Sequence, residues 1–287
     1  MAQSIYNIKD VYKEISTIDG YFCEKKDGSE FTDGTIDKYC PYNTTTKSNF
    51  CMNYFQNARS GVIHLLKNLE KYGLEYDKLA EYAILFLSYK LKQHSKHKLT
   101  KLNDFYTKNI EKIEYYNNNK IKVNGLTCKE IIDKKKDLMN TNEISKFNGP
   151  FSILVLLYNE IKKNNKDCTN LSQKANEFVQ NFIELNDDSN INGNTSYIKL
   201  LSTLSNDYDN FKIYFAEKCN GCNDLPTLPK IKTPPSKLIP VLSTFSVIPV
   251  FFGIAYKYSL FGVDKLFQRQ YLRKKLKKVK KKLKLNI

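Results

Sequence analysis

Apolar residues recur at helical spacing along most of the chain before residue 223. In Lys78–His94 they follow an i, i+3, i+4 pattern apolar enough for a central core helix, and Ser48–Tyr72 repeats it. Strict alternation and hairpin dipeptides, which would predict strands, are not found. We therefore predict an all-α fold, a helical bundle in one continuous domain without internal repeats. The other predicted helices are Ser4–Ser16, Thr100–Tyr116, Thr127–Met139, Phe151–Lys163, Leu171–Leu185 and Ile198–Ala216, with joints at Asn117–Asn119, Asn148–Pro150 and Asn186–Asn194.

One uncharged apolar segment, Leu238–Tyr256, differs from all the others. As a helix its 19 residues reach about 28 Å, close to the roughly 30 Å hydrocarbon core of a bilayer. A buried core helix is the alternative, but only a very basic tail follows that could cover it. We therefore predict one transmembrane helix, with Tyr256, Lys257 and Tyr258 as membrane-interface anchors.

The tail, residues 257–287, carries a net charge of +11, whereas the 256 residues before it carry +5. The positive-inside rule places such a tail in the cytoplasm and the N-terminal domain on the exoplasmic side. Apolar residues scattered among the bases allow the tail to form a helix lying on anionic lipid. The residues predicted to contact that lipid are Arg269, Arg273, Lys274, Lys275, Lys277 and Lys278.

The segment before the span is rich in proline and reads as an extended stalk. The predicted organisation is therefore a cysteine-containing helical domain at 1–223, a stalk at 224–237, a span at 238–256 and a cytoplasmic tail at 257–287. Met1–Ile15 lacks the apolar run of a signal peptide, so the span or another export route must direct the domain across a membrane.

The basic residues are 43 Lys against only 3 Arg, and Asn is abundant, which is typical of an AT-rich genome. Nucleic-acid binding through the tail is a possible interpretation of its charge. Base contacts favour Arg and stacking needs interleaved aromatic rings, and the tail has two Arg and Tyr271. A membrane-lipid partner explains the same residues better, so we predict no nucleic-acid partner.

All seven cysteines precede the span, which fits an oxidising exoplasmic side carrying disulfides. Three bridges with one free thiol is the simplest count, and the pairing stays open. The Cys219–Cys222 spacing also occurs in zinc and redox sites, but zinc needs two further ligands and redox motifs a βαβ unit. The candidate disulfide residues are Cys23, Cys40, Cys51, Cys128, Cys168, Cys219 and Cys222.

Candidate catalytic chemistry is weak. His94 and His97 share a helix end but lack a partnering carboxylate motif, and we expect them to be solvated. Phosphate loops, nucleophile elbows and acid–base constellations are not found. We therefore predict no catalytic residues, no metal, no cofactor and no small-molecule substrate.

Several segments resemble one known family, the Plasmodium interspersed repeat proteins (Cir/Yir/Bir). Glu81–Gln93 resembles that family's central helix motif, with Phe86 where Trp is common. Val11–Phe22, Cys219–Pro229 and Phe252–Leu283 are also similar, so the resemblance covers the chain end to end. It implies a variant antigen of rodent-malaria parasites, associated with infected-erythrocyte or parasite membranes and linked to antigenic variation and immune evasion.

Two hypotheses follow. In the first, the chain is a displayed antigen whose loops, such as Asn117–Asn119 and Asn186–Asn194, face an unidentified host or parasite protein. In the second, it is a tail-anchored adaptor with a cytosolic helical domain. The second would hold seven thiols in a reducing compartment and send a +11 tail across a membrane, and both are unfavourable.

Overall fold

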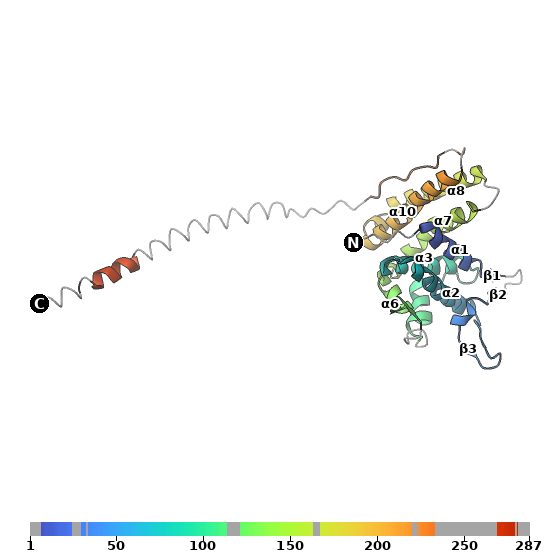
Figure 1. Cartoon of the computed structure of the whole chain (residues 1–287), viewed down its shortest axis with the longest axis horizontal. Helices are drawn as coiled ribbons and strands as arrows, with labels where there is room; N and C mark the ends of the chain where they lie inside the picture. The colour runs from blue at the N-terminus through green and yellow to red at the C-terminus, as the bar shows by residue number, and fades with distance from the viewer. Residues whose placement is uncertain are drawn as a thin grey trace. The chain divides into compact units, whose positions relative to one another are not determined.

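The computed structural model describes residues 7–24, 30–32, 34–113, 121–162, 167–219, 222, 224–232, 269–278 and 280. The chain divides into two compact units, Met1–Thr233 and Pro234–Ile287. The first unit is the helical domain drawn with most of the labels in Figure 1. The all-α prediction is confirmed for it, because the described residues are mostly helical with only short strands.

The elements of the domain follow in chain order. Its first half holds α1 (Ile8–Asp19), β1 (Phe22–Glu24), β2 (Glu30–Thr32), η1 (Asp37–Tyr39), β3 (Tyr42–Asn43), β4 (Ser48–Asn49), α2 (Tyr54–Leu69), η2 (Glu70–Tyr72) and α3 (Tyr76–Gln93). Its second half holds α4 (Leu102–Tyr106), the π-helical turn η3 (Thr107–Glu111), β5 (Lys122–Val123), β6 (Leu126–Thr127), α6 (Cys128–Asp133), η4 (Lys136–Met139), η5 (Asn142–Phe147), α7 (Asn148–Glu160), α8 (Cys168–Asp187), α9 (Ser189–Asn192) and α10 (Thr195–Lys218).

Two helices organise the bundle. α3 packs against α2, α6 and α7, and α7 packs in turn against α1, α8 and α10. In Figure 1, α8 and α10 lie together above α7, while α2, α3 and α6 lie below α1. Residues Leu79 to Leu91 of α3 are all buried, which confirms its predicted place at the centre of the core. Phe86, fully buried, lies edge-on to Phe22 from β1.

Helix starts are set by side chains that accept the first free backbone N–H groups. Asn53 caps α2, Asp167 caps α8 and Asn194 caps α10. Thr127 and Glu130 form a reciprocal capping box at the start of α6. These polar residues locate the helix boundaries that apolar periodicity alone left open by several positions.

The prediction that hairpin signals are absent was wrong. Three two-stranded antiparallel hairpins occur among the described residues: β1–β2, β3–β4 and β5–β6. The last turns at Asn124-Gly125, where both residues have positive φ, the dipeptide that tight hairpin turns require. Strands of two or three residues are too short to produce an alternating pattern, which is why the sequence pattern missed them.

The predicted joint at Asn148–Pro150 was also wrong, because these residues form the first turn of α7. Proline is tolerated there, since an N–H in the first turn has no helical acceptor. The helix predicted from Ser48 begins only at Tyr54, because Ser48 and Asn49 form β4.

The predicted span, 238–256, and the joint Asn117–Asn119 lie outside the described residues. Within the part of the chain that the structure describes, no helix has both the length and the apolar character needed to cross a bilayer. The single-pass topology therefore stays a prediction. In the second unit, residues 269–278 are helical.

Candidate functional site

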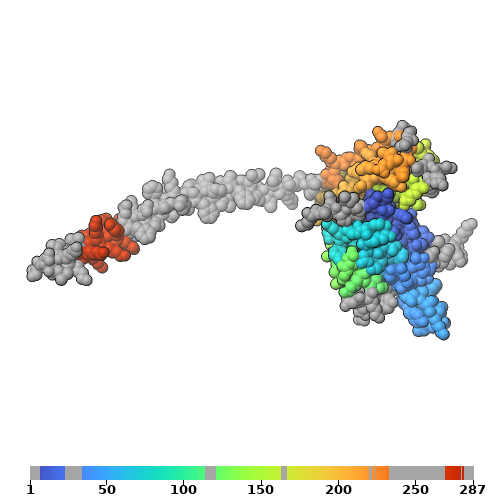
Figure 2. Space-filling view, in the orientation of Figure 1, coloured from blue at the N-terminus to red at the C-terminus, as the bar shows by residue number. Residues whose placement is uncertain are grey.

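A disulfide-closed hairpin stands out on the surface of the domain. Cys40 and Cys51 are joined by a disulfide, with their Cα atoms 5.1 Å apart, and β3 and β4 pair between them. The hairpin projects beyond the helices at the β3 label in Figure 1 and forms the blue projection in Figure 2. It is thus a raised, covalently closed element beside α2.

Three large apolar side chains are exposed here: Tyr42 and Phe50 lie inside the disulfide-closed hairpin, and Met52 directly follows Cys51. Tyr42 is 60% exposed, Phe50 50% and Met52 73%. We call these three residues the hairpin surface. Exposed apolar side chains are common singly, but three within eleven positions of a raised element are typical of a protein–protein contact.

The hairpin surface is held in place by local hydrogen bonds. The Nδ2 group of Asn49 donates to the carbonyls of Cys40 at 2.8 Å and Lys38 at 3.2 Å, across the base of the hairpin. At the tip, Oδ1 of Asn43 accepts from the N–H groups of Thr45 at 2.9 Å and Thr46 at 3.3 Å. With the disulfide, these bonds reduce the entropy lost when the hairpin binds a partner.

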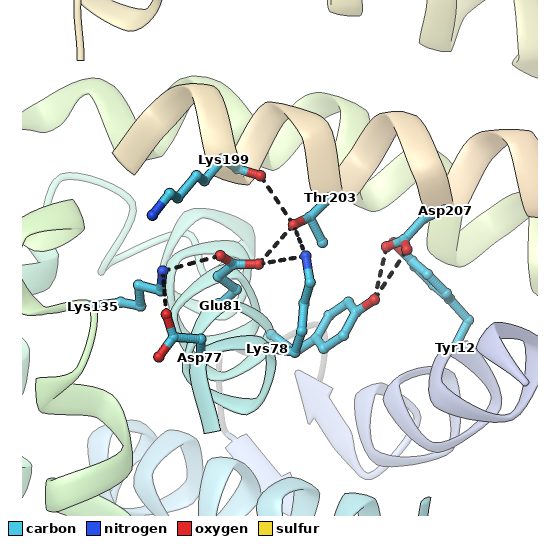
Figure 3. A network of polar contacts seen from close by, with 9 residues as sticks. Tyr12, Asp77, Lys78, Glu81, Lys135, Lys199, Thr203 and Asp207 are labelled. Carbon is cyan, nitrogen blue, oxygen red and sulfur yellow. Dashed lines mark hydrogen bonds and ion pairs between the residues drawn. The ribbon is translucent and has the colours of Figure 1, made fainter. Parts of the chain in front are cut away.

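Elsewhere in the domain, a buried carboxyl joins three helices of the core. The Oδ2 atom of Asp207 on α10 accepts hydrogen bonds from the hydroxyls of Tyr12 on α1 at 2.8 Å and Tyr82 on α3 at 3.0 Å (Figure 3). The hydroxyl of Tyr158 on α7 donates to the Asp207 carbonyl at 2.8 Å. Asp207 is only 3% exposed, so solvent does not reach the carboxyl.

Burial raises the pKa of Asp207 to about 7, although the two tyrosine hydroxyls act in the opposite direction. The desolvation cost of the charged form therefore outweighs its hydrogen bonds. A carboxyl with such a pKa resembles a catalytic acid, but this one is enclosed by tyrosines. Its role is to hold α10 against α1 and α3.

A second polar group surrounds Thr203, which lies one turn of α10 before Asp207 (Figure 3). Glu81, 3% exposed, is bonded by Thr203 Oγ1 at 2.7 Å and paired with Lys78 at 3.1 Å and Lys135 at 3.5 Å. Lys135 also pairs with Asp77 at 2.9 Å. Burial lowers the pKa of Lys135, but its two acidic partners outweigh that effect and the pKa is raised. These contacts tie α3 to α10 and to the segment after α6.

The cysteines form two disulfides in the described residues, not the three that the simplest count predicted. Besides Cys40–Cys51, Cys168 at the start of α8 is bonded to Cys222 after α10, with a Cα–Cα distance of 5.8 Å. Cys128 and Cys219 are buried free thiols. Burial raises the pKa of Cys128 to about 12, so its thiol stays protonated. Cys23 lies in β1, and its side chain is outside the described part.

Cys219 and Cys222 therefore form neither a disulfide with each other nor a pair of metal ligands. Cys222 bonds to Cys168 while Cys219 stays free, so the two cysteines have separate roles. The ligand atoms of Asp37, Cys40 and Cys51 lie within 4.8 Å of one another, which suits a metal. However, Cys40 and Cys51 are bonded to each other, and thiolates rather than disulfides bind metals.

The prediction that both histidines are solvated was wrong. His94 is only 3% exposed, and its ring centroid lies 4.5 Å from that of His97 and 4.2 Å from that of Tyr54. His97 in turn packs on Phe55 at 4.3 Å. The helix end carrying these rings folds back on the start of α2, a tertiary contact that local spacing does not reveal.

Residues 224–232, predicted to belong to the stalk, contain no helix or strand and lie on the helical domain. Leu225 is 5% exposed, and the hydroxyl of Tyr208 donates to the Pro226 carbonyl at 2.9 Å. Asn186 bonds the backbone of Lys230 and Lys232. The domain therefore extends to Thr233. The rest of the predicted stalk, 233–237, lies outside the described residues.

The residues predicted to contact anionic lipid lie together on the helix at 269–278. Arg269, Arg273 and the neighbouring lysines are all exposed, as are Leu272 and Leu276, which lie one turn apart. The predicted interface anchors Tyr256, Lys257 and Tyr258 lie outside the described residues.

Comparison with known proteins decides the family. The family model described as "Plasmodium variant antigen protein Cir/Yir/Bir" matches residues 12–257. The chain belongs to this family of Plasmodium variant antigens. The resemblance stated from the sequence is thus confirmed, and the match includes the helical domain and the predicted span. A search of curated proteins finds no match.

A solved structure supports the assignment of this Cir/Yir/Bir protein. The chain is similar to one described as "Structure of a Plasmodium PIR protein ectodomain", with 33% sequence identity and a TM-score of 0.59. The similarity covers 79% of this chain and 99% of that one. The helical fold is therefore shared with a solved ectodomain of the same family.

The sequence did not reveal Tyr42, Phe50 and Met52 as surface residues. Their available signal was the pair Cys40 and Cys51, which brackets a polar segment with Tyr42 and Phe50 near its ends and is followed directly by Met52. Apolar identity alone does not distinguish an exposed side chain from a core one.

Proposed function

We propose that this variant antigen is displayed on the membrane of the infected erythrocyte or of the parasite, as a non-catalytic protein-binding module. The helical domain is exoplasmic, residues 238–256 cross the bilayer, and the basic tail lies in the cytoplasm against anionic lipid. Its role is antigenic variation and interaction with a host or parasite protein.

The exoplasmic orientation is supported by the cysteine chemistry. Disulfides persist in oxidising compartments, and the domain contains the bonds Cys40–Cys51 and Cys168–Cys222. A tail-anchored adaptor would keep these four cysteines in the reducing cytosol, where such bonds are rare. The similarity to a PIR protein ectodomain supports the same orientation.

The protein-binding role rests on one observation, the exposure of Tyr42 and Phe50 on a hairpin closed by a disulfide and of Met52 directly beside it. Exposed aromatic and methionine side chains on a rigid support are the kind of residues that anchor protein interfaces. This hairpin surface replaces the joint Asn186–Asn194 as the favoured contact, because much of that joint is helical in α8 and α9.

Protease treatment of intact infected cells tests the orientation. The helical domain should be removed while the tail fragment stays membrane-bound and protected. A protected domain with a cleaved tail would reverse the topology and favour the adaptor.

Binding of the full chain to the surface of host cells tests the contact. Replacing Tyr42, Phe50 and Met52 together by Ser should lower binding at least about tenfold, since buried aromatic anchors contribute 2 kcal/mol or more. The matched control replaces Leu156 and Ile213, which are also exposed apolar residues but lie on helices α7 and α10. Equal losses in both variants would exclude the hairpin surface as the contact.

A further inference from the structure

A polar hollow of about 540 Å³ lies in the helical domain, and none of Tyr42, Phe50 and Met52 lines it. It is bounded by the C-terminal end of α3, the segment leading into α4 and the residues from Met139 to Asn148. Its volume is in the range of small-molecule sites in proteins. Most of its lining residues are polar or charged, and none is aromatic.

Two asparagines of the lining have unsatisfied acceptors. The Oδ1 atoms of Asn103 and Asn148 have no hydrogen-bond partner in the described structure, and Asn148 is only 7% exposed. A buried acceptor without a partner costs roughly 1–3 kcal/mol. Both Oδ1 atoms are screened from solvent, and both residues belong to the lining of the hollow. A ligand that donates hydrogen bonds would remove this cost.

Three lysines surround the same hollow. Lys92, Lys98 and Lys101 are exposed and form no ion pair with any residue that the structure describes, whereas Asp104 supplies a single opposing charge. Each unpaired ammonium attracts an anion by about 1 kcal/mol at 4 Å in water, and more in a recess of lower dielectric constant. The lining of the hollow therefore combines two neutral acceptors without partners and three exposed basic side chains.

These features select a class of ligand. An apolar compound does not suit a polar lining, and a nucleotide base would find no ring on which to stack. A sugar supplies hydroxyl donors for Asn103 and Asn148, and an attached acidic group supplies charge for the lysines. We propose that this hollow binds an acidic sugar, a single pyranose ring carrying a carboxylate or a sulfate.

This site departs from the expectation that the chain has no small-molecule ligand, and it does not depend on the proposed topology. A terminal acidic sugar of a glycan and the free acidic sugar share this chemistry. The two sources are distinguished by comparing the free monosaccharide with the same sugar at the end of a glycan attached to a bead.

The test is calorimetry on the full-length chain in mild detergent. The probes are N-acetylneuraminic acid and glucose 6-sulfate, with glucose as the uncharged control. At least one acidic probe should bind with a Kd of about 1 mM or lower, and at least about tenfold more tightly than glucose. No heat from either acidic probe up to about 10 mM, or equal binding of glucose, would overturn the proposal.

Two charge variants locate the site. Lys98→Gln with Lys101→Gln should weaken acidic-probe binding about tenfold, and both residues are exposed, so folding is retained. The matched control, Lys13→Gln with Lys212→Gln, removes the same charge from α1 and α10 and should leave binding unchanged. An equal loss in both would mean a general charge effect. Asn103→Ala should also weaken binding, by removing one acceptor.

Discussion

The Oδ1 atom of Asn186 accepts a hydrogen bond from the backbone N–H of Lys232 at 2.7 Å. The Nδ2 group of the same side chain donates to the carbonyl of Lys230 at 3.0 Å, so one amide binds the chain at both groups, as a β-strand neighbour would. Asn186 lies at the end of α8 and is 1% exposed. The last residues of the domain are therefore fixed to α8 before the chain continues toward the predicted span.

Asn186→Ala should release this segment. It leaves one backbone N–H and one carbonyl without their partner, which costs roughly 1–3 kcal/mol of local stability. Trypsin should then cleave after Lys230 and Lys232 at least about tenfold faster than in the parent chain. Asn190→Ala, an exposed position on α9, is the control and should not change the cleavage rate. Unchanged cleavage in both would mean that Asn186 does not hold the segment.

The two disulfides should differ in their contribution to stability. The Cys168–Cys222 bond closes a loop with a sequence separation of 54, and the Cys40–Cys51 bond one of 11. Chain-entropy reasoning gives about 4 kcal/mol for the longer loop and about 3 kcal/mol for the shorter one. Urea unfolding of the two double Cys→Ala variants should reproduce that order. If the short-loop variant proves the less stable one, the entropic account fails here.

Asp207 should make stability fall as pH rises. Its pKa is raised from 3.8 to about 7 in the folded state, so between these values the folded state binds a proton that the unfolded state has lost. The stabilisation is therefore complete below pH 3.8 and is lost as pH rises towards 7. Between about pH 5 and pH 7.5 the free energy of unfolding should drop by about 2 kcal/mol through this group alone.

Asp207→Asn isolates the contribution of Asp207, because an amide does not titrate. The free energy of unfolding of the parent should fall relative to that of the variant as pH rises from about 5 to about 7.5. Urea titrations of both proteins at these two pH values measure this change. The control Asp209→Asn, also on α10, should keep the pH dependence of the parent's unfolding free energy if that dependence comes from Asp207. A pH-independent difference would mean that the carboxyl is charged throughout.

The basic helix at 269–278 should order against anionic lipid. Each base near such a surface contributes about 1 kcal/mol. In nanodiscs containing phosphatidylserine, the amides of 269–278 should exchange hydrogen more slowly than in discs of neutral lipid. Replacing Lys274, Lys275, Lys277 and Lys278 by Gln should abolish the difference, whereas four Gln substitutions at exposed lysines of the helical domain should not. Equal exchange in both lipids would exclude the contact.

The long helices were predictable, and the short elements were not. α3 has an apolar pattern on every face that meets a neighbour, and α8 and α10 carry clear apolar stripes, so periodicity found them within a few residues. The hairpins lacked a pattern because their strands are so short. Asn124-Gly125 was an available signal, and reading it would have predicted the β5–β6 turn.

The candidate site was less predictable, because it depends on contacts between distant residues. Sequence spacing does not indicate that Cys168 pairs with Cys222 rather than with Cys219. Nor does it indicate that Tyr42 faces solvent while Tyr12, an equally apolar ring, is fully buried against Asp207. Such differences are set by tertiary packing, which leaves no local periodic signal.

The bond between Cys40 and Cys51 has a consequence for sequence drift. It fixes the two ends of the enclosed segment 5.1 Å apart at their Cα atoms, whatever lies between them. Insertions or replacements inside this ring leave the anchoring of α2 unchanged, since a closed loop grows at little entropic expense. Sequence changes between Cys40 and Cys51 can therefore alter the surface that antibodies contact, while the helices of the domain keep the same fold.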